Sequence, residues 1–452
     1  VFSVADTVSA SDGGNFGGNV GVGGTLATTG NATFSGDIIK STSGTSNFVA
    51  GVNAGNSIAS GGNYNTAVGD EAGTAISTGD NNVAVGFEAL KTEDAHGENT
   101  AVGSGALKNL NAGTDSKNTA IGYRAGTAMT TGRFNVLAGK DAGLAITGGD
   151  YNVAVGIEAL KTDTNGHTAV AIGTNALSTQ NFTSETQNFN VGVGYLAGAS
   201  LTTASAATIV GGLACDAMTT AAGTTAVGYS ALTDLVDQPN NTAVGQTALG
   251  NVTGAGNTGI GMSAGNGITS GQYNTAVGLV AATTTTYTGN FNTSLGYNAA
   301  PASATVSGNF TLGDGNISNL RCNDTSLGSL SDSRDKTNVI DSPYGLTFIN
   351  TVRPVQFRWE TRDGNVKDGS TRIGFLAQEL LTATDGNNAI LDLVSEQNPN
   401  KLEAKYGNLL PILVKAVQEL SAQVTALETE NATQATQIAD LISRVTALEN
   451  GE

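Results

Sequence analysis

The chain has 452 residues, of which 62 are glycine, 6 are proline and 13% are charged, and its formal net charge is −18 at pH 7. Glycine at about twice its usual frequency excludes an ordinary mixed α/β enzyme, and the lack of a three-residue glycine period excludes collagen. A chain this acidic has no electrostatic attraction for nucleic acid, so we expect no nucleic-acid partner. We also expect no membrane insertion, because no window holds roughly 18 consecutive apolar residues.

Few side chains of the chain suit metal or disulfide chemistry. Two cysteines, Cys215 and Cys322, cannot make a disulfide scaffold, and two histidines, His96 and His167, cannot make a histidine-rich metal site. We expect all four to be structural, and we predict neither a cofactor nor a bound metal.

Composition changes abruptly near residue 330. From Ser331 onward, 28 of 122 residues are charged and 7 are glycine, whereas the first 330 residues hold the other 30 charged residues and 55 glycines. Two different structural parts are therefore joined there. We predict a β-rich lead-in over 1–46, a repetitive shaft over 47–330, a small α+β domain over 331–408 and a coiled coil over 409–452.

The sequences of the lead-in and of the shaft both predict β-structure. Residues 18–37 alternate apolar residues with Gly and Asn, which predicts short β-segments similar to the repeats that precede many phage tail-fibre shafts. The shaft then repeats with a period of about 17 residues. Ala stands three residues after every repeat glycine, and Asn stands four residues before twelve of the fifteen. The repeat glycines are Gly51, Gly69, Gly86, Gly103, Gly122, Gly139, Gly156, Gly173, Gly194, Gly211, Gly228, Gly245, Gly261, Gly278 and Gly296, and a sixteenth, incomplete unit ends at Gly313.

This pattern predicts a stack of about fifteen β-coils. Each unit offers a short apolar β-run, a glycine that bends the chain, a small inward Ala and a return turn rich in Thr, Ser, Gly and Asp. The repeated Asn can form a hydrogen-bonded ladder that fixes the register of the coils. Small inward residues imply a thin interior whose apolar surface is covered by other subunits. The predicted fold is therefore mainly β, a trimeric β-roll or β-helix.

The repeat also resembles a known structure. Its Ala-Val/Ile-Gly-x-x-Ala pattern over residues 47–300 resembles the heads of trimeric bacterial adhesins, which are left-handed β-rolls built from somewhat shorter units. This resemblance implies a homotrimer.

Two sets of shaft side chains are candidates for binding. Aromatic residues directly precede six repeat asparagines, where they can stack on the sugar rings of a host glycan or pack against neighbouring coils at turn corners. Acidic turn residues can hold Ca²⁺, yet no fixed D-x-D-x-D spacing recurs, so we expect a solvated face instead. The aromatic set is Tyr64, Phe134, Tyr151, Phe189, Tyr273 and Phe291, and the acidic set is Asp70, Glu71, Asp80, Asp141 and Asp150.

The segment after residue 330 predicts a small α+β domain. Val355–Trp359 alternates like a half-buried strand, and Gly374–Leu381 opens an amphipathic helix. A domain of about 75 residues is a marginal fold by itself, so it should depend on partner chains.

Three strings in this domain closely resemble the endosialidase-type intramolecular chaperone, a self-cleaving serine peptidase at the C-termini of phage tail spikes and fibres: S-D-S-R-D-K, F-I-N-T-V-R-P-V-Q-F-R-W and R-I-G-F-L-A-Q-E-L. The resemblance covers residues 331–420. It implies that the domain trimerises, guides shaft assembly and then cuts itself free. By position in the S-D-x-R-x-K motif, Ser331 is the nucleophile, Lys336 its base, and Leu330–Ser331 the scissile bond. Asp335 stands where the family has a hydrophobic residue.

The implied chemistry is physically sound under one condition. A serine hydroxyl is a poor nucleophile unless a base takes its proton, and a lysine does so only if desolvation lowers its pKa. Asp332 and Asp335 oppose that lowering, so burial has to dominate, and a trimer interface can supply it. We expect no activity on external substrates.

The last segment follows a heptad pattern over five repeats. The polar layer at Asn431 and Gln434 sets register at some cost in stability. β-Branched residues at a with Leu at d favour dimers by themselves, whereas both resemblances call for three chains, and we predict a trimer. Position d holds Leu413, Leu420, Leu427, Gln434, Leu441 and Leu448, and position a holds Val417, Val424, Asn431, Ile438 and Val445.

Taken together, the sequence predicts a homotrimeric phage tail fibre, or receptor-binding appendage, located on the virion and assembled in the host cytoplasm. Its expected partners are phage tail or baseplate proteins and a host surface glycan or protein receptor. A bacterial surface adhesin is the alternative, although it needs a secretion signal and a membrane anchor that the sequence does not show. A glycan-degrading spike needs a pair of carboxylates set apart from the repeat pattern, and the shaft shows none.

Overall fold

A computed structural model describes residues 2–3, 20–21, 42–283, 286–314, 316–317, 331–358 and 369–451. The chain divides into two compact units, Val1–Phe134 and Asn135–Glu452. The predicted lead-in over 1–46 lies mostly outside the described residues. Its described part includes β1 (Phe2–Ser3), which pairs in parallel with β2 (Val20–Gly21).

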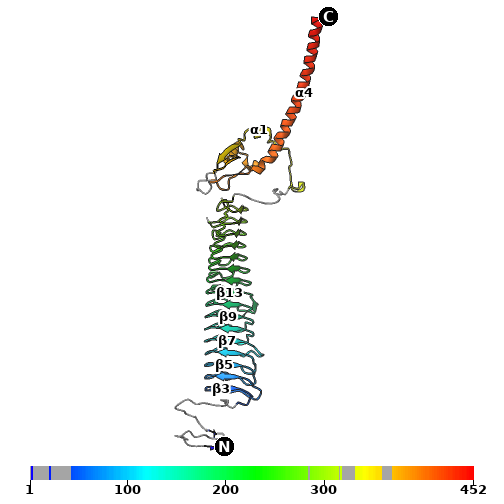
Figure 1. The fold of residues 1–452 in the computed structure, drawn as a ribbon. Helices are drawn as coiled ribbons and strands as arrows, with labels where there is room; N and C mark the ends of the chain where they lie inside the picture. Colours follow the sequence, from blue (N-terminus) through cyan, green and yellow to red (C-terminus); the bar gives the residue numbers. More distant parts are fainter. Residues whose placement is uncertain are drawn as a thin grey trace. The chain divides into compact units, whose positions relative to one another are not determined.

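The first unit holds five three-residue strands, one per coil. Neighbouring strands pair in parallel with the repeat positions aligned, so that Ala67 lies opposite Ala84 and Ala84 opposite Ala101. The strands stack one above another (Figure 1). They are β3 (Phe48–Ala50), β4 (Thr66–Val68), β5 (Val83–Val85), β6 (Thr100–Val102) and β7 (Thr119–Ile121).

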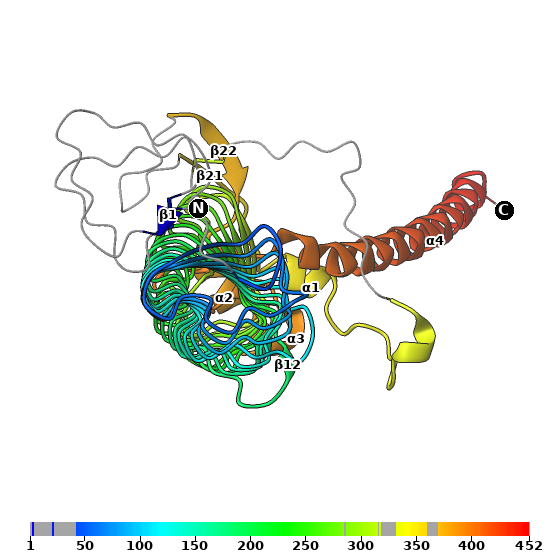
Figure 2. The same ribbon diagram turned by 90° about the horizontal axis from the view of Figure 1, so that it is seen from below.

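The second unit continues the same pattern in eleven strands. They are β8 (Val136–Ala138), β9 (Val153–Val155), β11 (Val170–Ile172), β13 (Val191–Val193), β14 (Thr208–Val210), β15 (Thr225–Val227), β16 (Thr242–Val244), β17 (Thr258–Ile260), β18 (Thr275–Val277), β19 (Thr293–Leu295) and β20 (Phe310–Leu312). Two further short strands, β10 (Gly166–His167) and β12 (Thr186–Gln187), pair where one coil widens, and the loop beside β12 extends outward from the coils in Figure 2.

The predicted fold class is thus confirmed: the chain is mainly β and forms a solenoid of about fifteen turns, one for each repeat glycine. The partial sixteenth unit is also confirmed, because β20 pairs in parallel with β19.

The repeat glycines are required by both backbone angle and space. Gly156 has φ +137°, and a Cβ at this residue would lie 2.4 Å from the carbonyl oxygen of Gly173 in the next coil. An L side chain fits neither the angle nor the gap. Each repeat glycine therefore lets the next coil approach at strand-pairing distance.

The asparagine ladder predicted from the repeat is present. Asn152 is fully buried; its Nδ2 donates to the Gly166 carbonyl (2.9 Å), and its Oδ1 accepts the Ala169 backbone N–H (2.9 Å). Asn152 itself donates its backbone N–H to Asn135 Oδ1 (2.9 Å). Each asparagine thus binds the backbone of its own coil and of the next one, which satisfies polar groups that the interior would otherwise leave unpaired.

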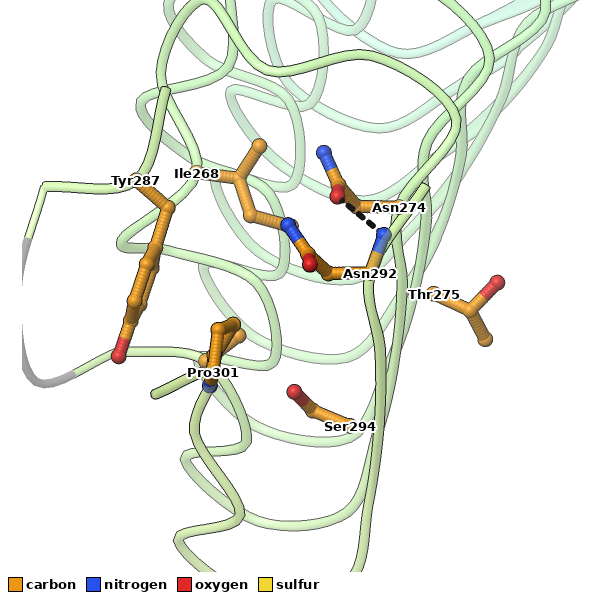
Figure 3. A pocket seen from close by; sticks show the side chains of 8 residues that line it. Ile268, Asn274, Thr275, Tyr287, Asn292, Ser294 and Pro301 are labelled. Carbon is orange, nitrogen blue, oxygen red and sulfur yellow. Dashed lines mark hydrogen bonds between the residues drawn. The ribbon is translucent and has the colours of Figure 1, made fainter. Parts of the chain in front are cut away.

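The interior is fuller than the sequence suggested. The predicted inward Ala residues, such as Ala159, are fully buried, but Leu, Ile and Met at two other positions fill the coil, among them Leu160 and Ile146. The expected thin interior was therefore wrong: most coils fill their own core. A small hollow remains near Tyr287, Ile268 and Pro301, beside the Asn274–Asn292 hydrogen bond (2.9 Å; Figure 3).

The C-terminal domain is a small α+β unit around one apolar cluster. The predicted strand is present as β21 (Val355–Arg358), which pairs antiparallel with β22 (Thr371–Gly374). The amphipathic helix α2 (Ala377–Ala383) begins three residues later than predicted. Also present are α1 (Leu346–Ile349), α3 (Asn388–Leu391), β23 (Val394–Ser395), β24 (Glu403–Ala404) and η2 (Tyr406–Leu409). The cluster comprises Phe348, Leu380, Leu391, Leu393, Val394, Leu409 and Ile412.

The chain's longest helix is α4 (Leu410–Glu449, 40 residues). Its first turns pack on the domain through Ile412 and Ala416, and Glu419 Oε2 accepts the backbone N–H of Leu346 at the start of α1 (2.7 Å). The apolar a and d side chains predicted for the coiled coil are all exposed, from Leu413 to Leu448. Among the described residues, no helix combines the length and apolarity that a membrane crossing requires.

Candidate functional site

The first residues of the C-terminal domain bring the predicted nucleophile and base together. A single 3-10 turn, η1 (Ser333–Asp335), reverses the chain between them, and the Lys336 backbone N–H bonds to the Ser333 carbonyl as the turn closes (3.3 Å). As a result, Lys336 Nζ donates a hydrogen bond to Ser331 Oγ at 2.6 Å. This is the distance that proton transfer between a nucleophile and its base requires.

Asp332, the acidic neighbour of the Ser331–Lys336 pair, binds a different cation. Asp332 caps η1 by accepting the Arg334 backbone N–H (2.9 Å), and its carboxylate also binds Arg334 Nε (3.0 Å) and Nη2 (2.6 Å). The Arg334 guanidinium holds the pKa of Asp332 below its usual value. Because the Asp332 carboxylate binds Arg334, it is not the side-chain partner of Lys336 Nζ, which donates to Ser331 Oγ.

The pair is open to solvent. Residues 331–340 are all exposed, Ser331 and Lys336 included. A lysine acts as a general base only where burial removes water from its amine, and Lys336 in this structure is not buried. In a single chain, the contact between nucleophile and base is therefore present without the desolvation that would activate the base. The predicted scissile residue Leu330 lies outside the described residues, as does Cys322.

The six predicted aromatic residues share one place in the coil, which we call the corner position: it lies five residues before the repeat glycine. All six are exposed, and all have positive φ, between +52° and +60°. The structure stacks two of them, Tyr273 on Phe291, with ring centroids 5.3 Å apart. This stack is a contact between neighbouring coils, as the packing alternative predicts, and every ring also stays exposed, as sugar binding requires; the choice between the two stays a prediction. The others are Tyr64, Phe134, Tyr151 and Phe189.

The expected solvated acidic face is only partly correct. Asp70 is exposed, and Glu71 and Asp80 are half-buried, but Asp141 and Asp150 are buried. The error has a simple cause: turn residues of one coil are covered by the next coil, which a single repeat unit does not reveal.

Two buried carboxylates escaped the sequence reasoning altogether. Asp163 is fully buried, where its Oδ1 accepts the backbone N–H groups of Gly166 and Phe182 (both 3.0 Å) and its Oδ2 binds Gln180 Nε2 (2.5 Å). Burial raises the pKa of Asp163. Glu93 takes the same place, seven residues after its repeat glycine, and burial also raises its pKa. Both carboxylates precede an elongated coil, and this is the signal that could have found them.

The residues suited to metal binding have a simpler explanation. Glu93, Asp94 and His96 place their ligand atoms within 4.8 Å of one another, the one such group in the described part of the chain. His96 Nδ1 bonds to Glu93 Oε1 at 3.2 Å, which accounts for the contact without an ion. The other histidine, His167, accepts the Asp150 backbone N–H on Nδ1 (3.0 Å), and Cys215 is buried with its thiol pKa raised by that burial.

Comparison with known proteins agrees with the domain's geometry. Residues 331–387, which are 57 of the 452, match the family model described as the chaperone of endosialidase. No curated protein matches the chain. The matched segment contains the Ser331–Lys336 pair at its first residues and follows the solenoid. A β-solenoid of about fifteen turns with this domain at its C-terminal side fits a tail fibre or tail spike that carries an intramolecular chaperone.

Proposed function

We propose that the protein is a homotrimeric phage tail fibre that attaches to the host surface, and that its C-terminal domain drives trimerisation and then cleaves the chain at Leu330–Ser331. The observation that carries the proposal is the 2.6 Å contact between Lys336 Nζ and Ser331 Oγ inside the matched segment. The fibre would be part of the virion, assembled in the host cytoplasm, with phage tail proteins and a host receptor as its partners.

The chemistry of cleavage follows from the position of the nucleophile. Ser331 lies on the amine side of the scissile bond, so its Oγ attacks the carbonyl carbon directly before it. Lys336 takes the Oγ proton and returns it to the departing Ser331 nitrogen, which leaves the Leu330 acyl group as an ester on Ser331 Oγ. Water then hydrolyses that ester, releasing the Leu330 carboxylate and restoring the serine hydroxyl.

Trimerisation supplies what a single chain lacks. Three copies of α4 can bury the a and d side chains that one copy exposes, such as Val417, Leu427 and Leu441. The same association would cover the exposed loop at Ser331 and Lys336 and remove water from the lysine amine, which is the condition for its action as a general base. Cleavage would then occur only after assembly.

The cleavage test compares Ser331→Ala and Lys336→Gln with Ser333→Ala, an exposed serine two residues away on η1. On a denaturing gel, wild type and Ser333→Ala should release residues 331–452, about 13 kDa of the 45.2 kDa chain. Ser331→Ala and Lys336→Gln should stay full length, and cleavage of Ser331→Ala would overturn the assignment. Light scattering of Ser331→Ala should give three times 45.2 kDa; twice that mass would contradict the trimer.

A further inference from the structure

The corner position is a backbone site that does not favour aromatic residues. Coil after coil, the residue five before the repeat glycine has a left-handed φ, and several coils place Gly or Asn there, among them Gly223 (φ +66°), Asn240 (+63°) and Gly256 (+71°). A bulky L residue in this region is strained by about 1 kcal/mol or more. Tyr273 (φ +57°) and Phe291 (φ +58°) occupy it in consecutive coils. These two rings therefore raise the conformational energy of the backbone that carries them.

Burial of the two rings does not offset this backbone strain. Their planes lie within 10° of parallel with centroids 5.3 Å apart, yet Tyr273 remains 55% exposed and Phe291 64% exposed. Tyr273 lies against Gly256 on the side of the preceding coil, since a Cβ at that glycine would lie 2.7 Å from the ring. In the following coil the corner position is Gly308, where an added Cβ would meet nothing within 4 Å. The face of Phe291 turned away from Tyr273 is therefore not covered by that corner.

Neutral polar groups line the column beside the rings. Gln272, Asn290 and Ser307 precede successive corner residues, with Asn290 Oδ1 accepting the Gln272 backbone N–H (2.7 Å) and Ser307 Oγ accepting the Asn290 backbone N–H (3.0 Å). These bonds fix the side chains of Asn290 and Ser307 beside the corner column, and the bond to Oδ1 orients the Asn290 amide group. No charged residue occurs in 271–276, 289–293 or 306–310.

We infer that the Tyr273–Phe291 pair is a carbohydrate-binding platform for a neutral pyranose. The C–H face of a sugar ring carries partial positive charge and fits the negative face of an aromatic ring, and amide and hydroxyl groups bind the sugar's hydroxyls. An uncharged rim favours a neutral sugar over a sialic or uronic acid. This inference rests on the proposed attachment function and names the ligand class and the site.

A second copy of the shaft is a weaker candidate for this surface. Contacts between copies along a shaft need a continuous apolar column, and the corner column is interrupted by Ala206, Gly223, Asn240 and Gly256. A more continuous apolar column lies on either side of the repeat glycine, where most coils expose a large apolar side chain. In these coils the exposed residues are Tyr229, Val244, Ile260, Met262, Leu279, Tyr297 and Leu312.

The test uses the double variant Tyr273→Asn/Phe291→Asn in the full chain carrying Ser331→Ala, because Asn tolerates a left-handed φ and keeps the corner geometry. Phe48→Thr is the control: it removes an exposed ring (42%) that lies outside both the corner column and the column beside the repeat glycines, at a strand position where other coils hold Thr. The probes are neutral hexose and N-acetylhexosamine oligosaccharides, with sialylated and uronic-acid oligosaccharides as the charged set. Saturation-transfer NMR and an oligosaccharide array measure binding.

Wild type and Phe48→Thr should bind at least one neutral probe, and the double variant should bind it about tenfold or more weakly, as expected when an aromatic anchor is lost. The thermal midpoint of the double variant should be unchanged or higher, because two strained residues are relieved. A lower midpoint with unchanged binding, a changed oligomeric mass, or wild type that binds only charged probes or none would each overturn the inference. Trimer mass and cleavage before Ser331 are measured separately, so this inference can fail while the proposed function stands.

Discussion

Removing one asparagine of the ladder should cost more than a surface hydrogen bond. In Asn152→Ala, two buried backbone groups lose their partners: the Gly166 carbonyl, bound at 2.9 Å by Nδ2, and the Ala169 N–H, bound at 2.9 Å by Oδ1. Both residues are buried, so water does not replace the amide. At about 2 kcal/mol for each unsatisfied buried group, the free energy of unfolding should fall by about 4 kcal/mol.

Urea denaturation followed by circular dichroism measures this loss, and hydrogen exchange locates it at the Ala169 amide. Asn251→Ala is the matched control: its residue is exposed and Nδ2 makes a 2.7 Å bond to the Asn266 carbonyl, so the change should stay below about 1 kcal/mol. If Asn152→Ala lost no more stability than the control, and Ala169 exchanged as slowly as in wild type, the ladder would not hold the coils together as argued.

Two further predictions concern the glycine column and the buried carboxylate. Gly173→Ala should lower the free energy of unfolding by more than about 3 kcal/mol, because its φ is +132° and the new Cβ would lie 2.4 Å from the Gly194 carbonyl oxygen. Gly113→Ala, where φ is +70° and no atom lies within 4 Å, should lose only about 1 kcal/mol in the same urea titration. For Asp163, burial raises the folded pKa above its unfolded value of about 3.9, so the folded state binds the proton more tightly and stability falls as pH rises from about 4 through the folded pKa. The stability of wild type minus that of Asp163→Asn should therefore decrease over that range, and a difference that rises or stays flat would refute the sign.

The features that recur in every coil were predictable from sequence. Gly, Asn and Ala recur at fixed positions of the repeat because each contacts the equivalent residue of the next coil. Every coil therefore imposes the same requirement at these positions, and the requirement is visible as a period in the sequence. Asn152 and Gly156 illustrate this: ladder and close approach both follow from stacking identical units. The Ser331–Lys336 contact, by contrast, was expected only from a resemblance, since a spacing of five residues says nothing of a turn such as η1.

The sequence did not reveal features of one coil that depend on how the following coil differs from the average repeat. Asp163 stands in a column that elsewhere holds buried apolar residues such as Ile146 and Leu201. Its partner Phe182 N–H belongs to a coil of 21 residues, from Gly173 to Gly194, whose extra chain leaves backbone groups for the carboxylate to bind. The sequence of the Asp163 coil alone does not contain that cause. Asp141 and Asp150 were misjudged for a different reason, since these turn residues are covered by a following coil of ordinary length.

The irregular coils also solve a problem that regularity creates. A solenoid of near-identical units can shift by one coil and keep almost every ladder bond, glycine contact and inward Ala, so the regular positions specify register weakly. A shifted coil would set the buried Asp163 carboxylate against a coil of ordinary length, without the Phe182 N–H and Gln180 Nε2 that stabilise it. An unpaired buried charge costs several kcal/mol, far more than a regular coil gains or loses by shifting. Thus the polar interruptions of the apolar column, rather than the repeat itself, select the native alignment of the coils.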